Sequence, residues 1–95
     1  MLSTEIITKI EYNKNIIIYT KNNNYIIKVN KGTIKCEIIT NENENVSLKY
    51  LEVGDVVTIE YNKDHVNKYD NLILNIVKKI LVQTKYNILS DSSEE

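Results

Sequence analysis

Few residues in this chain could catalyse a reaction or bind a metal ion. There is one cysteine, Cys36, and one histidine, His65. Cys36 lies in an alternating apolar segment, where a cysteine acts as a small hydrophobic residue rather than a nucleophile. His65 lies in a polar segment with no serine or cysteine nearby in sequence, so we expect it to be exposed rather than to act as a base. One cysteine and one histidine cannot form a zinc site from these residues, and one cysteine excludes an internal disulfide.

The acidic and glycine residues do not form a catalytic motif either. Glu42 and Glu44 alternate with asparagine, but a calcium loop needs more ligands at fixed offsets and a turn glycine. Gly32 and Gly54 are the only glycines and lie too far apart in sequence for a phosphate-binding loop. We therefore expect a protein that is not an enzyme and that has no cofactor, metal site or small-molecule substrate.

Lysine and tyrosine offer a binding chemistry instead. Lysines neutralise phosphates, and a tyrosine ring can stack on a nucleic-acid base. These considerations give six candidate nucleic-acid-binding residues: Lys9, Lys28, Lys35, Lys63, Lys68 and Tyr69. The competing interpretation is that lysines keep a β-rich surface soluble and protect sheet edges.

The composition weakens the case that the lysines form a nucleic-acid-binding surface. The chain has sixteen isoleucines, fourteen asparagines, twelve lysines and seven tyrosines, but no alanine, arginine, proline, tryptophan or phenylalanine. The favoured residues have A/T-rich codons, which indicates an AT-rich genome such as that of a giant DNA virus or an intracellular parasite. The formal net charge is −1. A dedicated duplex-DNA binder is strongly basic, so this balance argues against that class.

The elements that would position these residues are strands. Isoleucine, valine, threonine and tyrosine fill the apolar runs, and asparagine, lysine and glycine separate them. Six strands are predicted, at about 4–12, 15–21, 24–30, 33–40, 55–62 and 71–82. The segments 41–48 and 62–71 are predicted to be polar loops. The last strand also fits helical spacing, with Asp70 as the N-cap, so a helix at 71–82 is the alternative.

Alternation within these strands separates an apolar face from a mixed face. Tyr25 and Tyr61 fall on the apolar face and are predicted to pack in the core. Ile7, Ile26 and Ile39 are predicted to share the mixed face with the lysines. A cluster of exposed isoleucines indicates a protein interface, so self-association into a homodimer is expected there.

The chain is long enough for one domain, expected over residues 1–89. Residues 90–95 are acidic and are expected to form a disordered tail. No apolar run is long enough to span a membrane, and no signal peptide is apparent. The expected location is therefore inside the producing cell, in cytoplasm or nucleus, or packaged in a virion, and the protein is not expected to be secreted.

Two segments resemble OB-fold barrels. The run from Lys31 to Cys36, with its Gly-Thr turn and alternating Ile and Cys, resembles the turn joining strands 2 and 3 of replication-protein-A-like OB-folds. The run from Leu48 to Tyr61, with its Gly-Asp turn and alternating strand, resembles the approach to strand 4 in OB and cold-shock barrels. The resemblance covers about residues 31–82. The helix usual between strands 3 and 4 has no clear counterpart at 41–48, and cold-shock phenylalanines are absent.

The resemblance implies a small all-β antiparallel barrel of five to six strands, with an SH3-like barrel as the alternative. OB-folds bind oligonucleotides on the face of strands 2 and 3 and with two flanking loops, here assigned to 21–24 and 62–71. We therefore expect binding of single-stranded DNA or RNA with little sequence preference. The alternative is a structural or protein-interaction module, such as a viral accessory or virion protein.

Overall fold

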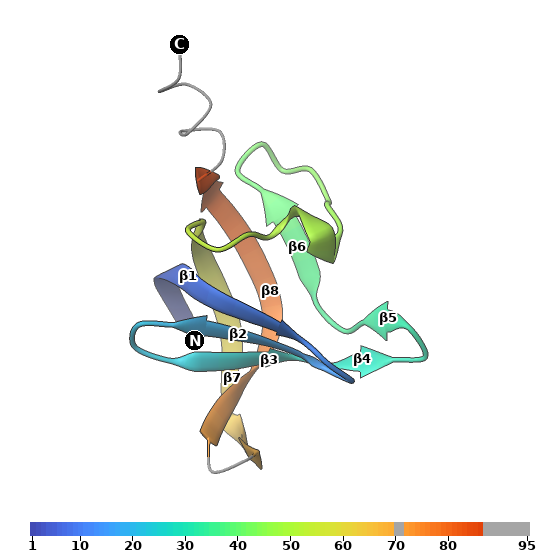
Figure 1. Cartoon of the computed structure of the whole chain (residues 1–95). Helices are drawn as coiled ribbons and strands as arrows, with labels where there is room; N and C mark the ends of the chain where they lie inside the picture. The colour runs from blue at the N-terminus through green and yellow to red at the C-terminus, as the bar shows by residue number, and fades with distance from the viewer. Residues whose placement is uncertain (70–71, 87–95) are drawn as a thin grey trace.

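The computed structural model describes residues 1–69 and 72–86, with side chains described outside 63–72. Its elements are eight strands and one short 3-10 helix (Figure 1). They are β1 (Leu2–Tyr12), β2 (Ile16–Thr20), β3 (Asn24–Ile27), β4 (Val29–Asn30), β5 (Thr33–Ile34), β6 (Glu37–Thr40), η1 (Leu48–Tyr50), β7 (Val56–Tyr69) and β8 (Leu72–Thr84). Among the described residues, none belongs to a helix long and apolar enough to cross a membrane.

Five of the strands close into a barrel in the order β3-β2-β1-β7-β8, with β8 pairing back onto β3. β1 makes closure feasible because it bends. Its residues 2–6 pair with β7, its residues 7–12 pair with β2, and its register shifts between Ile7 and Lys9. The predicted small all-β barrel is confirmed, and its strand order is compatible with an OB-like barrel. The sheet is mixed rather than purely antiparallel, because β3 and the extra strand β6 both run parallel to β8.

Inward-pointing aliphatic side chains fill the barrel. Ile18, Ile27 and Ile59 are fully buried together with Tyr25. The rings of Tyr25 and Tyr61 meet edge to face at 5.3 Å, so the core assignment of Tyr25 is confirmed, while Tyr61 lies half-buried against the core. Cys36 also packs against the core, and burial raises the pKa of its thiol to about 11.

The predicted exposed isoleucine cluster is wrong, because Ile7, Ile26 and Ile39 are all buried. The register shift after Ile7 breaks the alternation of β1, so Ile7 points inward although Lys9 points outward. Ile26 does point away from the main core, but it forms a second apolar cluster with Ile17 and Leu74. Ile39 lies beside the following loop, to which it is bridged at Asn45.

Several predicted boundaries also need correction. The predicted loop at 62–71 is wrong for residues 62–69, because β7 continues to Tyr69 and pairs with β8. The helix alternative at 71–82 is wrong, since β8 is a strand. The predicted strands 24–30 and 33–40 each break in two, and β4 and β5 form a separate hairpin outside the barrel. The Lys31–Gly32 turn therefore joins β4 to β5, while residues 21–23 connect the second and third barrel strands.

Candidate nucleic-acid interface

One continuous stretch of the chain carries positive charge only. From Tyr12 to Cys36 there are five lysines and no acidic residue, although the whole chain has more acids than lysines. These lysines are Lys14, Lys21, Lys28, Lys31 and Lys35. The net charge of the chain conceals this asymmetry, which could have been found by counting charge in windows.

The fold brings four of these lysines to one side of the barrel. Lys14 lies in the turn between β1 and β2, and the other three lie on or beside the β4–β5 hairpin. The backbone N–H of Val29 donates to Asn15 Oδ1 at 3.0 Å, which fastens the hairpin to the turn. The backbone N–H of Lys35 donates to the carbonyl of Lys28 at 2.8 Å, so these two lysines flank the base of the hairpin.

The hairpin tip presents Lys31 to solvent. Lys31 and Gly32 both have positive φ, at 53° and 78°, as a tight two-residue hairpin turn requires. Lys14, Lys31 and Lys35 are exposed and Lys28 is half-buried. None of the four forms an ion pair with another described residue. We call Lys14, Lys28, Lys31 and Lys35 the basic side.

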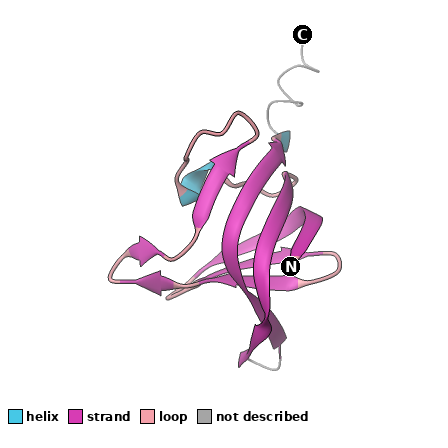
Figure 2. Cartoon of the chain, turned by 180° about the vertical axis from the view of Figure 1, so that it is seen from behind, coloured by secondary structure: helices cyan, strands magenta, loops and turns pink. Residues whose placement is uncertain are grey.

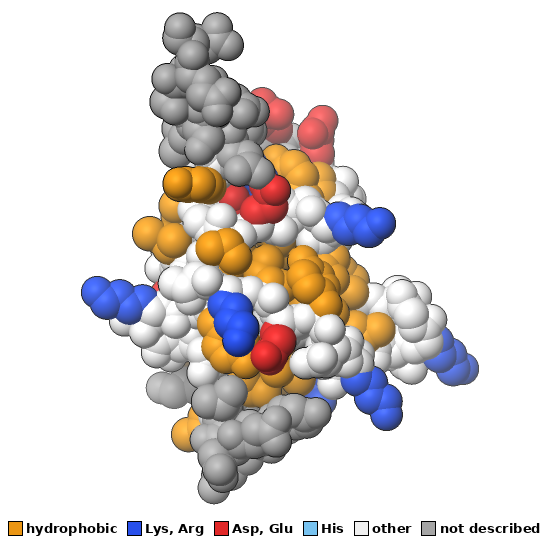
Figure 3. All heavy atoms as spheres, in the orientation of Figure 1, with side chains coloured by type: hydrophobic (Ala, Val, Ile, Leu, Met, Phe, Trp, Pro, Cys, Tyr) orange, Lys and Arg blue, Asp and Glu red, His pale blue; other side chains and the backbone are white. Residues whose placement is uncertain are grey.

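Two hollows lie against the basic side. A hollow of ≈ 90 Å³ separates the β1–β2 turn from the outer face of the second and third barrel strands, at Ile17 and Ile26. A wider groove of ≈ 550 Å³ lies between the β5–β6 segment and residues 45–48, with Ile34, Cys36 and Leu48 in its lining. In Figure 3 several lysine side chains lie along the right of the molecule and others at its left and centre, and acidic side chains lie mainly near the top.

The predicted site residues are divided by the structure. Lys28 and Lys35 come together on the basic side, where their backbones share a hydrogen bond. Lys9 lies elsewhere on β1, where its ammonium is 3.6 Å from Glu11 and 5.2 Å from the centre of the Tyr19 ring. Lys9 therefore has an acidic partner on its own strand, although its side chain is exposed. The remaining candidates lie on β7, and their side chains are outside the described set: Lys63, Lys68 and Tyr69. The side chain of His65 is outside it as well.

A second group of charged residues lies near the end of β8 and holds the fold together. Asp55 is fully buried, and its carboxylate accepts hydrogen bonds from the backbone N–H of Glu52 at 2.9 Å and of Tyr86 at 3.0 Å. The Lys85 ammonium donates to Asp55 and to the carbonyl of Tyr50, and lies 3.3 Å from Glu52. We call Asp55 and Lys85 with these partners the clasp.

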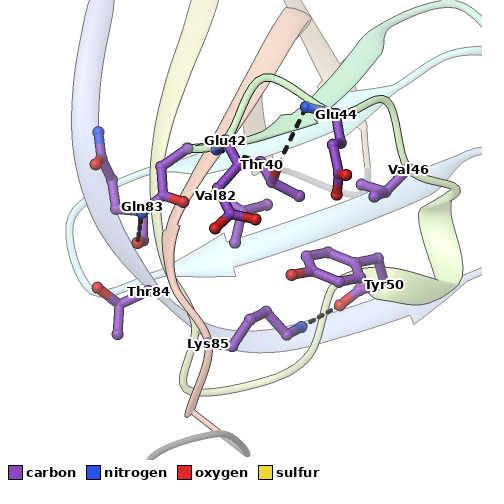
Figure 4. Close-up of a pocket in the computed structure, with 10 residues that line it drawn as sticks. Thr40, Glu42, Glu44, Val46, Tyr50, Val82, Gln83, Thr84 and Lys85 are labelled. Atoms are coloured by element: carbon purple, nitrogen blue, oxygen red, sulfur yellow. Dashed lines mark hydrogen bonds between the residues drawn. The ribbon is translucent and has the colours of Figure 1, made fainter.

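A pocket of ≈ 310 Å³ opens beside the clasp (Figure 4). Glu42 and Glu44 face it from the loop after β6, and the Tyr50 ring lies over Lys85, whose ammonium is 4.4 Å from the ring centre. The ammonium is already engaged by the clasp. Within the described ranges, no group of three His, Cys, Asp or Glu side chains could hold a metal ion.

Glu5 is a second buried carboxylate, at the β1 end of the barrel. It accepts hydrogen bonds from Ser3 Oγ at 2.6 Å, Tyr25 Oη at 3.0 Å and Asn23 Nδ2 at 3.1 Å. Burial by itself would raise the pKa of Glu5, but these hydrogen bonds outweigh it and hold the pKa below 4.5. Burial, together with the Glu5 charge, raises the pKa of Tyr25 to about 12. Neither Glu5 nor the clasp was identified as a site by sequence reasoning.

We compared the chain with known protein families, curated proteins and solved structures. No protein-family model, curated protein or solved structure matches the chain. The geometry of the barrel and its basic side therefore carries the functional argument.

Proposed function

We propose that this protein binds single-stranded nucleic acid with little sequence preference, through the basic side. The observation that carries the proposal is the acid-free stretch from Tyr12 to Cys36, in which four of the five lysines gather around one turn and one hairpin. Ammonium groups that form no ion pair with another described residue suit a phosphate backbone, since each contact releases counterions.

The position of the basic side on the barrel supports the same function. In OB-like barrels, oligonucleotides bind over strands 2 and 3 and beside the loop between strands 1 and 2. Here that loop carries Lys14, and the smaller hollow lies between it and the outer face of β2 and β3. The β4–β5 hairpin extends this surface away from the barrel (Figure 1).

A preference for single strands follows from the shape of the basic side. The wider groove offers apolar side chains from Ile34 and Cys36, the two sequence neighbours of Lys35, against which an unpaired base can lie. Tyr12 ends β1 beside the turn and is 57% exposed, so its ring can stack on a base. A duplex keeps its bases stacked inside the helix and cannot use either feature.

Fluorescence anisotropy with a labelled strand of about 20 nucleotides tests this proposal, at about 50 and 200 mM salt and with the matching duplex alongside. We expect tighter binding of the single strand, and binding that weakens as salt rises. Tyr12→Ala should weaken binding roughly fivefold, by loss of about 1 kcal/mol of stacking, whereas Tyr86→Ala, at an equally exposed tyrosine outside the basic side, should not. Failure to bind either form at the lower salt concentration would overturn the proposal.

A further inference from the structure

The first half of β1 has a free edge. Residues 2–6 pair with β7 on one side, and pairing with β2 begins only at Ile7. Met1 and Tyr61 exchange backbone hydrogen bonds at 3.0 and 2.9 Å, and the N–H of Ile7 donates to the carbonyl of Asp55 at 3.0 Å. In an antiparallel ladder, alternate residues face the same partner. The backbone N–H and C=O groups of Leu2, Thr4 and Ile6 therefore point away from β7, toward an edge that no strand of the described chain occupies.

This edge has neither lysine nor proline to discourage strand addition. Native edges commonly carry lysine, proline or an inward charge that discourages pairing. Here the outward side chains are Leu2, Thr4 and Ile6, with Leu2 70% and Ile6 56% exposed. The one charged side chain of this segment, Glu5, points inward and is buried, and its Oε2 accepts three hydrogen bonds within the same copy.

The surroundings leave room for another strand. A hollow of ≈ 350 Å³ separates Thr4 and Ile6 from Lys21 and Asn22 of the β2–β3 turn. The outer face beyond β1 is uncharged at Val56 and Thr58 of β7 and Leu81 of β8. Its charges lie at one end, where Glu60 pairs with Leu2 on one side and with Lys79 on the other. Thr4 and Thr58 bond through their hydroxyls at 2.9 Å, which keeps this face in register.

We infer that this edge pairs with the same edge of a second copy of the chain, in antiparallel register with Thr4 facing Thr4. This register places Leu2 of each copy opposite Ile6 of the other. Such cross-strand pairs are favourable, and the arrangement satisfies the free backbone groups of both copies. The dimer has a continuous sheet that runs from β7 of one copy to β7 of the other.

The self-complementarity of the sequence favours a second copy over an unrelated peptide. A twofold interface requires that residue i meets j wherever j meets i. The segment from Leu2 to Ile6 meets this requirement with apolar residues at both ends, threonine at the centre, and Ser3 opposite the Glu5 carboxylate. No like charges meet directly across the pair. Because the shared edge is short, we expect a weak dimer, with a Kd on the order of 10–100 µM.

The inferred dimer leaves the basic side open. Seen from behind, the first half of β1 lies at the right-hand border of the barrel and the β4–β5 hairpin at the left-hand border (Figure 2). A dimer would thus present two basic sides. The inference does not rest on the proposed function, and each can fail without the other.

Sedimentation velocity over a concentration series, on the full chain, tests the dimer. Ile6→Lys and Leu2→Glu should each raise the dimer Kd at least tenfold, because each places a charge opposite an apolar side chain. Both sites are exposed, so the fold should survive, as circular dichroism would verify. Combining Leu2→Glu with Ile6→Lys should restore dimerisation, because the introduced carboxylate faces the introduced ammonium of the second copy. Ile73→Lys, at a 60% exposed position on β8, is the matched control and should leave the Kd unchanged.

Two outcomes would overturn the inference. One is a wild-type protein that stays monomeric up to about 500 µM, well above the Kd range of a small interface; capture of an extended peptide by that monomer would assign the edge to a different partner. The other is a dimer that the Ile6→Lys and Ile73→Lys variants weaken equally, or that the combined variant fails to restore. That result would place the interface elsewhere.

Discussion

The basic side and the clasp use lysine in opposite ways. Lys85 is only 9% exposed, and its ammonium is held by Asp55, Glu52 and the carbonyl of Tyr50. Lys14, Lys31 and Lys35 are exposed and form no ion pair with another described residue. In a chain with twelve lysines, burial and pairing separate the lysine that holds the fold from those able to meet a ligand. The clasp should therefore affect stability, and the basic side should affect binding.

The largest stability effect is expected at Asp55. Asp55→Ala removes the acceptor for two backbone N–H groups and leaves the Lys85 ammonium buried without its main partner. Breaking a buried pair in this way costs about 3–5 kcal/mol. Urea unfolding measures the loss. Lys31→Ala is the matched control from the basic side and should change stability by less than about 0.5 kcal/mol; equal losses would erase the distinction between the two regions.

Gly54 should show the next largest effect, because it lies directly against Tyr86, whose backbone is part of the clasp. Its φ is +99°, and a Cβ there would lie 2.8 Å from Cγ of Tyr86. Gly54→Ala should therefore destabilise the protein by roughly 1–3 kcal/mol through backbone strain and overlap. Gly32 also has positive φ but has nothing within 4 Å of that position, so Gly32→Ala should cost only the strain. A Gly32→Ala variant as unstable as the Gly54 variant would contradict this account.

Glu5 gives a smaller and pH-dependent effect. Its folded-state pKa lies below the unfolded value near 4.5, so its stabilisation is present above that pH. The stabilisation is lost as the pH falls through the folded-state pKa. Glu5→Gln should cost about 1–2 kcal/mol at neutral pH and should reduce the acid sensitivity of unfolding. Unchanged acid sensitivity in the variant would show that Glu5 does not titrate in the way described.

Cys36 should show the smallest effect, one on reactivity. Burial raises its pKa to about 11, so the thiol is almost fully protonated at neutral pH, and only the thiolate reacts with iodoacetamide. Alkylation of the folded protein should be more than tenfold slower than in urea. Equal rates would mean that the groove lined by Cys36 is more open than its geometry indicates.

Much of the fold could be predicted because the alternation of isoleucine and polar residues is regular over most strands. Prediction from this alternation failed at Ile7, where a bulge reverses the faces of β1. It also failed at Ile26, an outward residue that a second apolar cluster covers. The segment 62–69 was predicted to be a loop because its residues are polar, yet pairing with the apolar β8 makes it a strand. Strand pairing between distant segments overrides local composition in such cases.

The candidate site was harder to predict for a similar reason. Lys28 and Lys35 were identified, but Lys14 and Lys31 were not, since only the fold brings the β1–β2 turn beside the β4–β5 hairpin. The clasp joins Asp55 to Lys85 across thirty positions, and no local pattern marks either residue as buried. Contacts of this range depend on barrel closure rather than on neighbouring residues.

The most direct test of the central claim compares two charge-reversal pairs by anisotropy with the same labelled single strand. Lys14→Glu with Lys31→Glu alters the basic side, whereas Lys21→Glu with Lys78→Glu alters exposed lysines elsewhere and changes the net charge equally. We expect the first pair to weaken binding at least tenfold and to reduce the salt dependence by about 0.7 for each lost phosphate contact, and the second pair to have little effect. Equal weakening by both pairs would show that binding depends on overall charge, and would contradict a defined basic side.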